Sequence, residues 1–109
     1  MRFLMLVCTD TEPVAAPTSP PRDIEEWVDE NDSRGTRIVG ERLVPEGQAR
    51  TVRVRGGKRV VTDGPFLETK EVLGGFDLLE CRDLDEAIAI AADHPMASYG
   101  VIELRALMD

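Results

Sequence analysis

The stretch FDLLECRDLDEAIAIAADHPMASYGVIELRALM, residues 76–108, decides the fold. It opens with residues 76–81, FDLLEC, which predict a strand. Asp83 follows, with a glutamate three residues later, which is the pattern of a capping box at the start of a helix. Apolar side chains then recur at helical spacing until Pro95, which cannot continue a helix. Residues 101–108 alternate between apolar and polar, as a half-buried strand does. The stretch therefore predicts a strand, a helix and a second strand.

The first part of the chain repeats this order. Residues 2–8 form a short apolar run without Gly or Pro, typical of a central strand. Asp23 caps a second predicted helix, which follows a proline-rich loop. Residues 36–44 are expected to form a strand, and residues 50–61 a hairpin that turns at a Gly-Gly pair. Without the hairpin, a strand–helix–strand unit occurs twice. We therefore expect a single α+β domain over residues 1–109, a ferredoxin-like split βαβ with an inserted β-hairpin.

Composition excludes several classes of partner and site. The chain carries 13 basic and 21 acidic residues, a net charge of -8, so neither nucleic acid nor an anionic membrane is expected to bind it. Its apolar runs are far shorter than the roughly 20 residues that span a bilayer, and the first run is too short for a signal peptide. Two cysteines and one histidine lack metal-ligand spacing, and no cofactor fingerprint occurs. We expect a cytoplasmic protein without metal or cofactor.

The ferredoxin-like plan predicts which distant segments meet. The last strand lies beside the first, and the first beside the third core strand. The C-terminal end of the first strand, called the top of the sheet here, therefore collects Asp10, the connection 62–75, His94 and Tyr99. Structureless connections of about 14 residues are uncommon in compact domains unless they bind something. We expect the functional site at the top.

Six short motifs carry a resemblance to a known family. They are Asp63-Gly64-Pro65-Phe66, Glu68-Thr69-Lys70-Glu71, Gly74-Gly75-Phe76, Asp85-Glu86-Ala87, His94-Pro95 and Ile102-Glu103-Leu104-Arg105. In this order the chain resembles the DGPF branch of the YCII-related proteins over nearly its whole length. The resemblance implies a dimeric α+β barrel, a bacterial origin, a His–Asp site and genes often adjacent to those of extracytoplasmic-function sigma factors. It brings no agreed reaction.

His94 and Asp63 are the predicted catalytic pair. Many YCII relatives carry a histidine shortly after the first strand; this chain has none there, and His94 is its only histidine. A carboxylate beside an imidazole raises the imidazole pKa and selects one tautomer, which suits a general base near neutral pH. The alternative for His94 is a helix-terminal residue that meets the last carbonyls. The alternative for Asp63 is a residue that only shapes its turn.

Six further residues are expected to bind a ligand. They are Asp10, Glu68, Lys70 and Tyr99 around the pair, and Arg53 and Arg55 on the hairpin. The hairpin is locally basic on an acidic protein, which points to a small anionic ligand. The alternative is a solvated charged face.

Two functions stay open at this point. One is a small-molecule enzyme that works by acid–base proton transfer in a cleft at the top of the sheet. The other is a non-catalytic binding or regulatory module associated with a sigma factor. A homodimer is expected in either case, because a sheet with helices on one face leaves leucine and valine exposed on the other.

Overall fold

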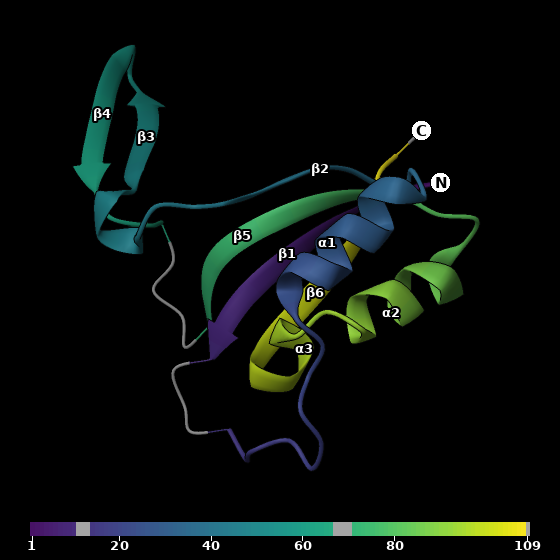
Figure 1. The fold of residues 1–109 in the computed structure, drawn as a ribbon. Coiled ribbons are helices and arrows are strands. Elements are labelled where there is room, and N and C mark those ends of the chain that lie inside the picture. Colours follow the sequence, from purple (N-terminus) through teal and green to yellow (C-terminus); the bar gives the residue numbers. More distant parts are fainter. Residues whose placement is uncertain (11–13, 67–70, 109) are drawn as a thin grey trace.

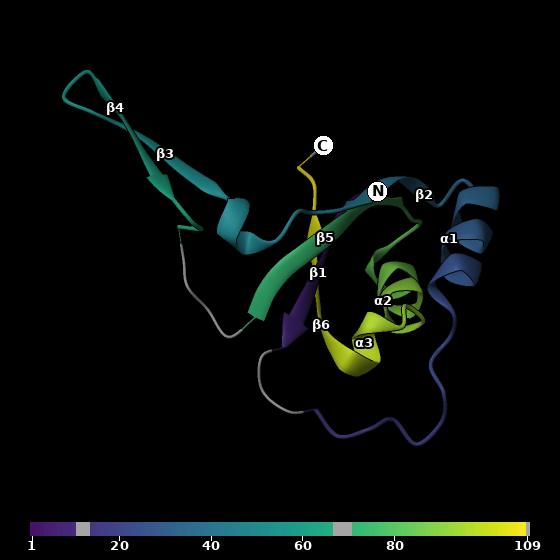
Figure 2. The same cartoon turned by 60° about the vertical axis from the view of Figure 1, so that its left-hand side comes forward.

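The structure is a computed structural model that describes residues 1–10, 14–66 and 71–108. One antiparallel sheet has the order β2-β5-β1-β6, formed by β1 (Arg2–Asp10), β2 (Arg37–Arg42), β5 (Glu71–Glu80) and β6 (Gly100–Ala106). The helices α1 (Ile24–Ser33), α2 (Leu84–Ala92) and the short α3 (Met96–Tyr99) lie together on one face (Figures 1 and 2). Strands β3 (Arg50–Arg55) and β4 (Lys58–Asp63) form a separate hairpin after the single-turn helix η1 (Glu46–Gln48). The strand order confirms the predicted ferredoxin-like α+β fold.

The core lies between the sheet and the two longer helices. Alternation along β1 buries Phe3 and Met5 toward the helices and leaves Leu4 and Leu6 half-buried on the other face. The buried cluster consists of Phe3, Met5, Trp27, Leu79, Cys81, Ala87 and Ala91. The Trp27 indole Nε1 donates to the Ile90 carbonyl at 3.0 Å, which fixes α1 against α2. None of the described helices is long and apolar enough to span a bilayer.

Strand β5 begins earlier than expected. It starts at Glu71, so Gly74 and Gly75 belong to the sheet and not to a loop. A Cβ atom at position 75 would lie 3.1 Å from the Glu41 carbonyl oxygen, so glycine permits the close approach of β2. The expected connection over 62–75 is wrong in its second part, because β5 begins at Glu71. The top of the sheet is nevertheless where β1 ends and β5 and β6 begin.

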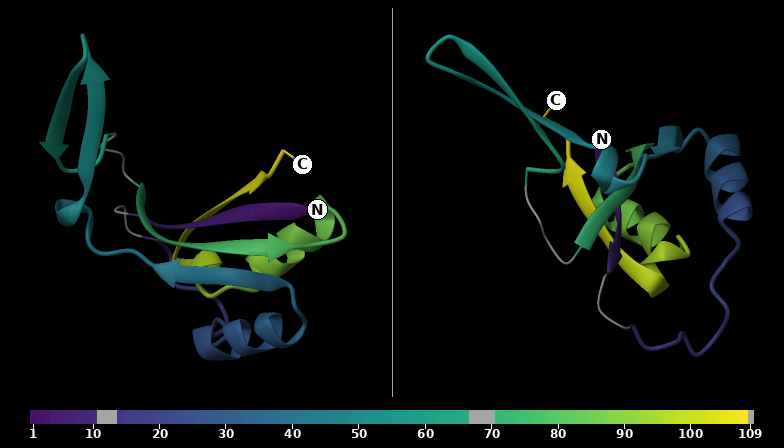
Figure 3. Two further views of the ribbon diagram at one scale, coloured as in Figure 1. Left: turned by 90° about the horizontal axis from the view of Figure 1, so that it is seen from above. Right: turned by 90° about the vertical axis from the view of Figure 1, so that its left-hand side faces the viewer.

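The β3–β4 hairpin stands apart from the sheet. It turns through Gly56 (φ 57°) and Gly57 (φ 76°), a left-handed pair that suits a tight two-residue turn. In Figures 2 and 3 it projects to the side of the sheet opposite the helices.

Candidate functional site

Three polar side chains are buried in the described part of the chain: Asn31, Asp77 and His94. Asn31 Nδ2 donates to the Trp27 carbonyl oxygen at 2.8 Å, one helical turn back, and has a structural role. Asp77 and His94 line a cleft of about 660 Å³ between α1 and the helix face of the sheet. Buried polar groups need partners, so what each of the two contacts decides its chemistry.

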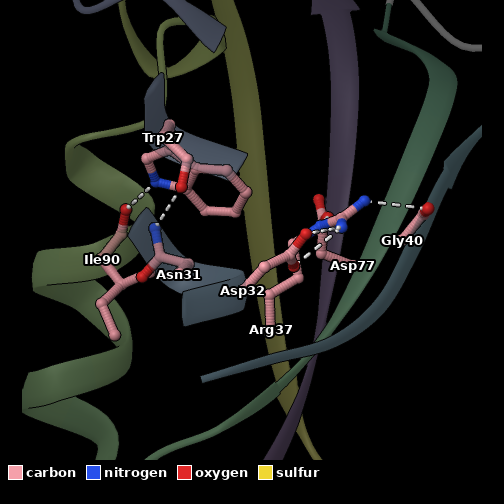
Figure 4. Close-up of polar contacts among 7 residues, drawn as sticks. All are labelled: Trp27, Asn31, Asp32, Arg37, Gly40, Asp77 and Ile90. Carbon is pink, nitrogen blue, oxygen red and sulfur yellow. Dashed lines mark hydrogen bonds and ion pairs between the residues drawn. The ribbon is translucent and has the colours of Figure 1, made fainter. Parts of the chain in front are cut away.

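Asp77 is held by a single arginine. It shares the helix face of β5 with Leu79, and Arg37 Nε donates to its Oδ1 at 2.7 Å (Figure 4). The same guanidinium donates to the Gly40 carbonyl oxygen at 2.9 Å and to Asp32 Oδ1 at 3.0 Å. Burial raises the pKa of Asp77, and the bond from Arg37 opposes that rise. Oδ2 accepts no hydrogen bond from the described residues. Because no fully buried side-chain oxygen is left without a partner there, Oδ2 keeps contact with solvent, and the residue lines the cleft.

Gly40 makes room for this ion pair. A Cβ atom there would lie 2.0 Å from Asp77 Oδ1 and 2.6 Å from Arg37 Nη2. We expect Gly40→Ala to lower the free energy of unfolding by about 2 kcal/mol, because overpacking forces both buried groups to shift. Urea unfolding measures the change. Gly47→Ala is the matched control, since nothing lies within 4 Å of its added Cβ atom. Equal stability of the two variants would contradict the close packing of the pair.

His94 is a neutral hydrogen-bond donor in this fold. It follows the end of α2 and packs edge-on against Trp27, with ring centroids 4.7 Å apart. Its Nδ1 accepts from the Met96 backbone N–H at 3.0 Å, so the neutral ring carries its proton on Nε2. Nε2 makes no hydrogen bond within the described segments and is not fully buried, and His94 lines the cleft. Burial lowers the His94 pKa to about 4. This value lies below the pKa near neutrality that the sequence predicted, because burial of the ring acts without a stabilising carboxylate among the described residues.

The expected contact between Asp63 and His94 does not form within the chain. Asp63 ends β4 on the outlying hairpin, where its Oδ1 accepts from Arg50 Nε at 3.1 Å and its side chain is 87% exposed. The carboxylate is therefore engaged at the base of the hairpin, whereas His94 is buried beside α1. The sequence correctly located the hairpin turn at Gly56 and Gly57, but it could not show that the hairpin leaves the sheet.

The other predicted site residues are dispersed. Asp10 ends β1 at the top of the sheet, and Tyr99 ends α3 with about half of its surface exposed. Arg53 lies over the Phe66 ring, 5.2 Å from its centroid, and Arg55 donates to the Val54 carbonyl oxygen on the hairpin. Neither arginine lines the cleft. Glu68 and Lys70 lie outside the described residues. The ligand-binding roles of all six residues stay predictions.

The sequence interpretation missed Arg37 and Asp77. One signal was present: Asp77 is the only charge in the run 76–79, and strand alternation puts it on the buried face with Leu79. A buried carboxylate needs a cation or a hydrogen-bond donor, which marks a site or an ion pair. No three His, Cys, Asp or Glu side chains gather as a metal site within the described ranges.

Comparison with known proteins identifies relatives. A sequence model of the YCII-related domain matches residues 1–109. An uncharacterised protein, R00369 of Rhizobium meliloti (strain 1021), is 50% identical over 68 residues, which cover 61% of this chain and 55% of that protein. Among solved structures, 5-chloro-2-hydroxyhydroquinone dehydrochlorinase (TftG) of Burkholderia phenoliruptrix AC1100, in complex with 2,5-dihydroxybenzoquinone, matches with a TM-score of 0.45 and 13% identity. That match covers 99% of this chain and 94% of TftG.

Proposed function

We propose that this chain, which belongs to the YCII-related domain family, binds a small molecule in the cleft beneath α1 and transfers a proton on it. The observation that carries the proposal is the pair of cleft-facing groups. Among the described residues, a buried carboxylate with one oxygen free of hydrogen bonds and a neutral imidazole N–H belong to two side chains that line the same cleft. The first can accept a proton, and the second can donate a hydrogen bond to an oxygen that gains negative charge.

Asp77 takes the role of base that the sequence interpretation gave to His94. Its raised pKa makes the carboxylate a stronger proton acceptor than an exposed aspartate. Arg37 holds Oδ1 and thereby orients Oδ2 toward the cleft. His94, with a pKa of about 4, stays neutral near pH 7 and serves as a donor and not as a base. This division of roles fits removal of a proton next to a carbonyl group.

The walls of the cleft favour an uncharged ligand. Apolar surface comes from Val7, Trp27, Val28 and Met96. The charged side chains that line it are two arginines and three carboxylates: Arg37, Arg42, Glu25, Glu41 and Asp77. These charges nearly balance, so an anion gains little here. The anionic ligand expected at the hairpin is a separate proposal, which the cleft does not support.

Hydrogen–deuterium exchange in D₂O tests the reaction class. We expect the protein to speed the loss of the proton signal next to the carbonyl for some members of a panel of small uncharged ketones and cyclic diketones. Asp77→Asn should reduce this rate by about 100-fold or more, since the base is lost while the shape is kept. His94→Phe should reduce it by about 100-fold through loss of the Nε2–H donor. Proton NMR follows the exchange.

Asp63→Asn is the matched control and should leave the rate unchanged, because Asp63 is exposed on the hairpin. A rate lost in Asp63→Asn and kept in Asp77→Asn would restore the sequence-based assignment. If compounds shift the Trp27 indole resonance but none exchanges faster than in buffer, the catalytic proposal is wrong. The non-catalytic binding module, with or without a sigma factor, is then the function.

A further inference from the structure

One face of the β3–β4 hairpin carries three valines, next to Arg50, Arg59 and Asp63, and in the described part of the chain these valines stay largely exposed. Val52 lies opposite Val61 in the register, and Val54 is two residues further along β3, so the three share one face. Their exposed fractions are 61% for Val52, 62% for Val54 and 54% for Val61. A two-stranded hairpin by itself is marginally stable in water. Packing against another surface would both cover the valines and hold the hairpin.

The charge of the hairpin indicates what that surface is. Residues 50–63 carry five basic side chains and one acidic side chain, whereas the other 95 residues carry eight basic and twenty acidic ones. The hairpin therefore has a net charge of +4 on a body of net charge -12. Its described ion pair joins Arg50 to Asp63 within the hairpin, not to the body. A second copy of this acidic body has the complementary charge.

The position of the hairpin fits the same partner. It projects on the side of the open sheet face (Figures 2 and 3). On that face Leu4 lies opposite Leu78, and Leu6 opposite Phe76, all half-buried in a single chain. This is the apolar face through which the sequence predicts a homodimer. A copy seated there lies next to the hairpin.

We propose that the hairpin is an intersubunit arm, whose valine face packs on the body of a second copy of this chain. The arm extends the homodimer proposal from the sheet face to a second contact. It is independent of the proposed reaction, because the cleft lies on the helix face of the sheet. Loss of the arm contact changes association, whereas loss of the cleft chemistry changes exchange rates.

Sedimentation of two charge variants tests the contact. We expect Val54→Asp to raise the dimer dissociation constant at least tenfold, since it places a carboxylate within the buried face. Thr62→Asp is the matched control, because it adds the same charge on the opposite, exposed face of the hairpin and should change the constant less than threefold. Val54 is largely exposed in one chain, so its substitution leaves the fold of the body intact. Equal effects of the two variants, or a monomeric parent protein, would overturn the proposal.

Chemical cross-linking locates the arm directly. Lys58, which follows the hairpin turn, is one of two lysines in the chain. In a dimer mixed from ¹⁴N- and ¹⁵N-labelled protein, a carbodiimide should couple Lys58 to body carboxylates of the other isotope. Lys58→Arg keeps the charge and should remove those peptides. Lys58 coupled only within its own chain would refute the arm even if the protein is a dimer.

Discussion

Arg37→Met is expected to lower the free energy of unfolding by about 3–5 kcal/mol at pH 7. The substitution keeps an apolar stem but leaves the Asp77 carboxylate buried without a cation, with only 9% of its side chain exposed. The Arg37 bond to the Gly40 carbonyl is lost as well. The protein then retains the desolvation of Asp77 without the interaction that offsets it.

The pH dependence of this loss identifies its cause. Removal of Arg37 raises the Asp77 pKa further above its unfolded value, so the variant folds with Asp77 increasingly protonated. A group whose pKa is raised on folding stabilises the fold below its unfolded pKa, and this contribution is lost as pH rises through the folded pKa. The loss in free energy of unfolding of Arg37→Met, relative to the parent protein, should therefore be small at pH 4 and complete at pH 7. Urea unfolding at both pH values measures it.

Two further variants separate the buried contact from the exposed one. Asp32 is the partner of Arg37 on the solvent side, and its side chain is 48% exposed. Asp32→Asn should therefore lower the free energy of unfolding by less than about 1 kcal/mol. The double variant Arg37→Met/Asp77→Asn removes both charges and should recover part of the loss. A deficit that is the same at pH 4 and pH 7, without recovery in the double variant, would show that packing and not charge is responsible.

The fold was predictable because local signals agree with the global plan. Asp23 and Asp83 each accept a backbone N–H at a helix start, as their positions in the sequence predicted. The apolar run of residues 2–8 predicted a central strand, and the alternation of residues 101–108 predicted the face of β6 that packs on the core. What could not be predicted is the length of β5. Gly74 and Gly75 resemble loop residues by propensity, but pairing with the neighbouring strands holds them in the sheet.

The site was predictable only in part. The topology correctly brought His94 to the top of the sheet beside the cleft, but its protonation depends on burial against Trp27, which no local pattern encodes. Asp63 was chosen for its motif, and the direction in which a hairpin leaves a sheet is set by long-range packing. The Arg37–Asp77 pair joins residues 40 positions apart through the β2–β5 register, which only the folded sheet defines.

His94 is expected to make the stability of the protein depend on pH between about 6.5 and 4. Its pKa is about 4 in the fold and near the ordinary histidine value of 6.5 in the unfolded chain. Between these values the unfolded state binds more protons, so the free energy of unfolding rises with pH. The contribution is fully present above pH 6.5 and is lost as pH falls toward 4, on the order of 3 kcal/mol in total. Denaturant unfolding from pH 7.5 to 5 covers the upper part of this range, above most carboxylate titrations.

His94→Gln isolates the effect, since a side chain that does not titrate in this range leaves only the contribution of the other groups. The difference in the free energy of unfolding between the parent protein and His94→Gln should therefore change by up to about 1.4 kcal/mol per pH unit below pH 6. It should level off above pH 7. In the parent protein, the ring proton resonances of His94 should stay constant from pH 8 to 5, because a ring with a pKa near 4 remains neutral there. A titration midpoint at 6.5 or above would mean that a carboxylate reaches the ring in solution. His94 would then be able to act as the base, and Asp77 would lose that role.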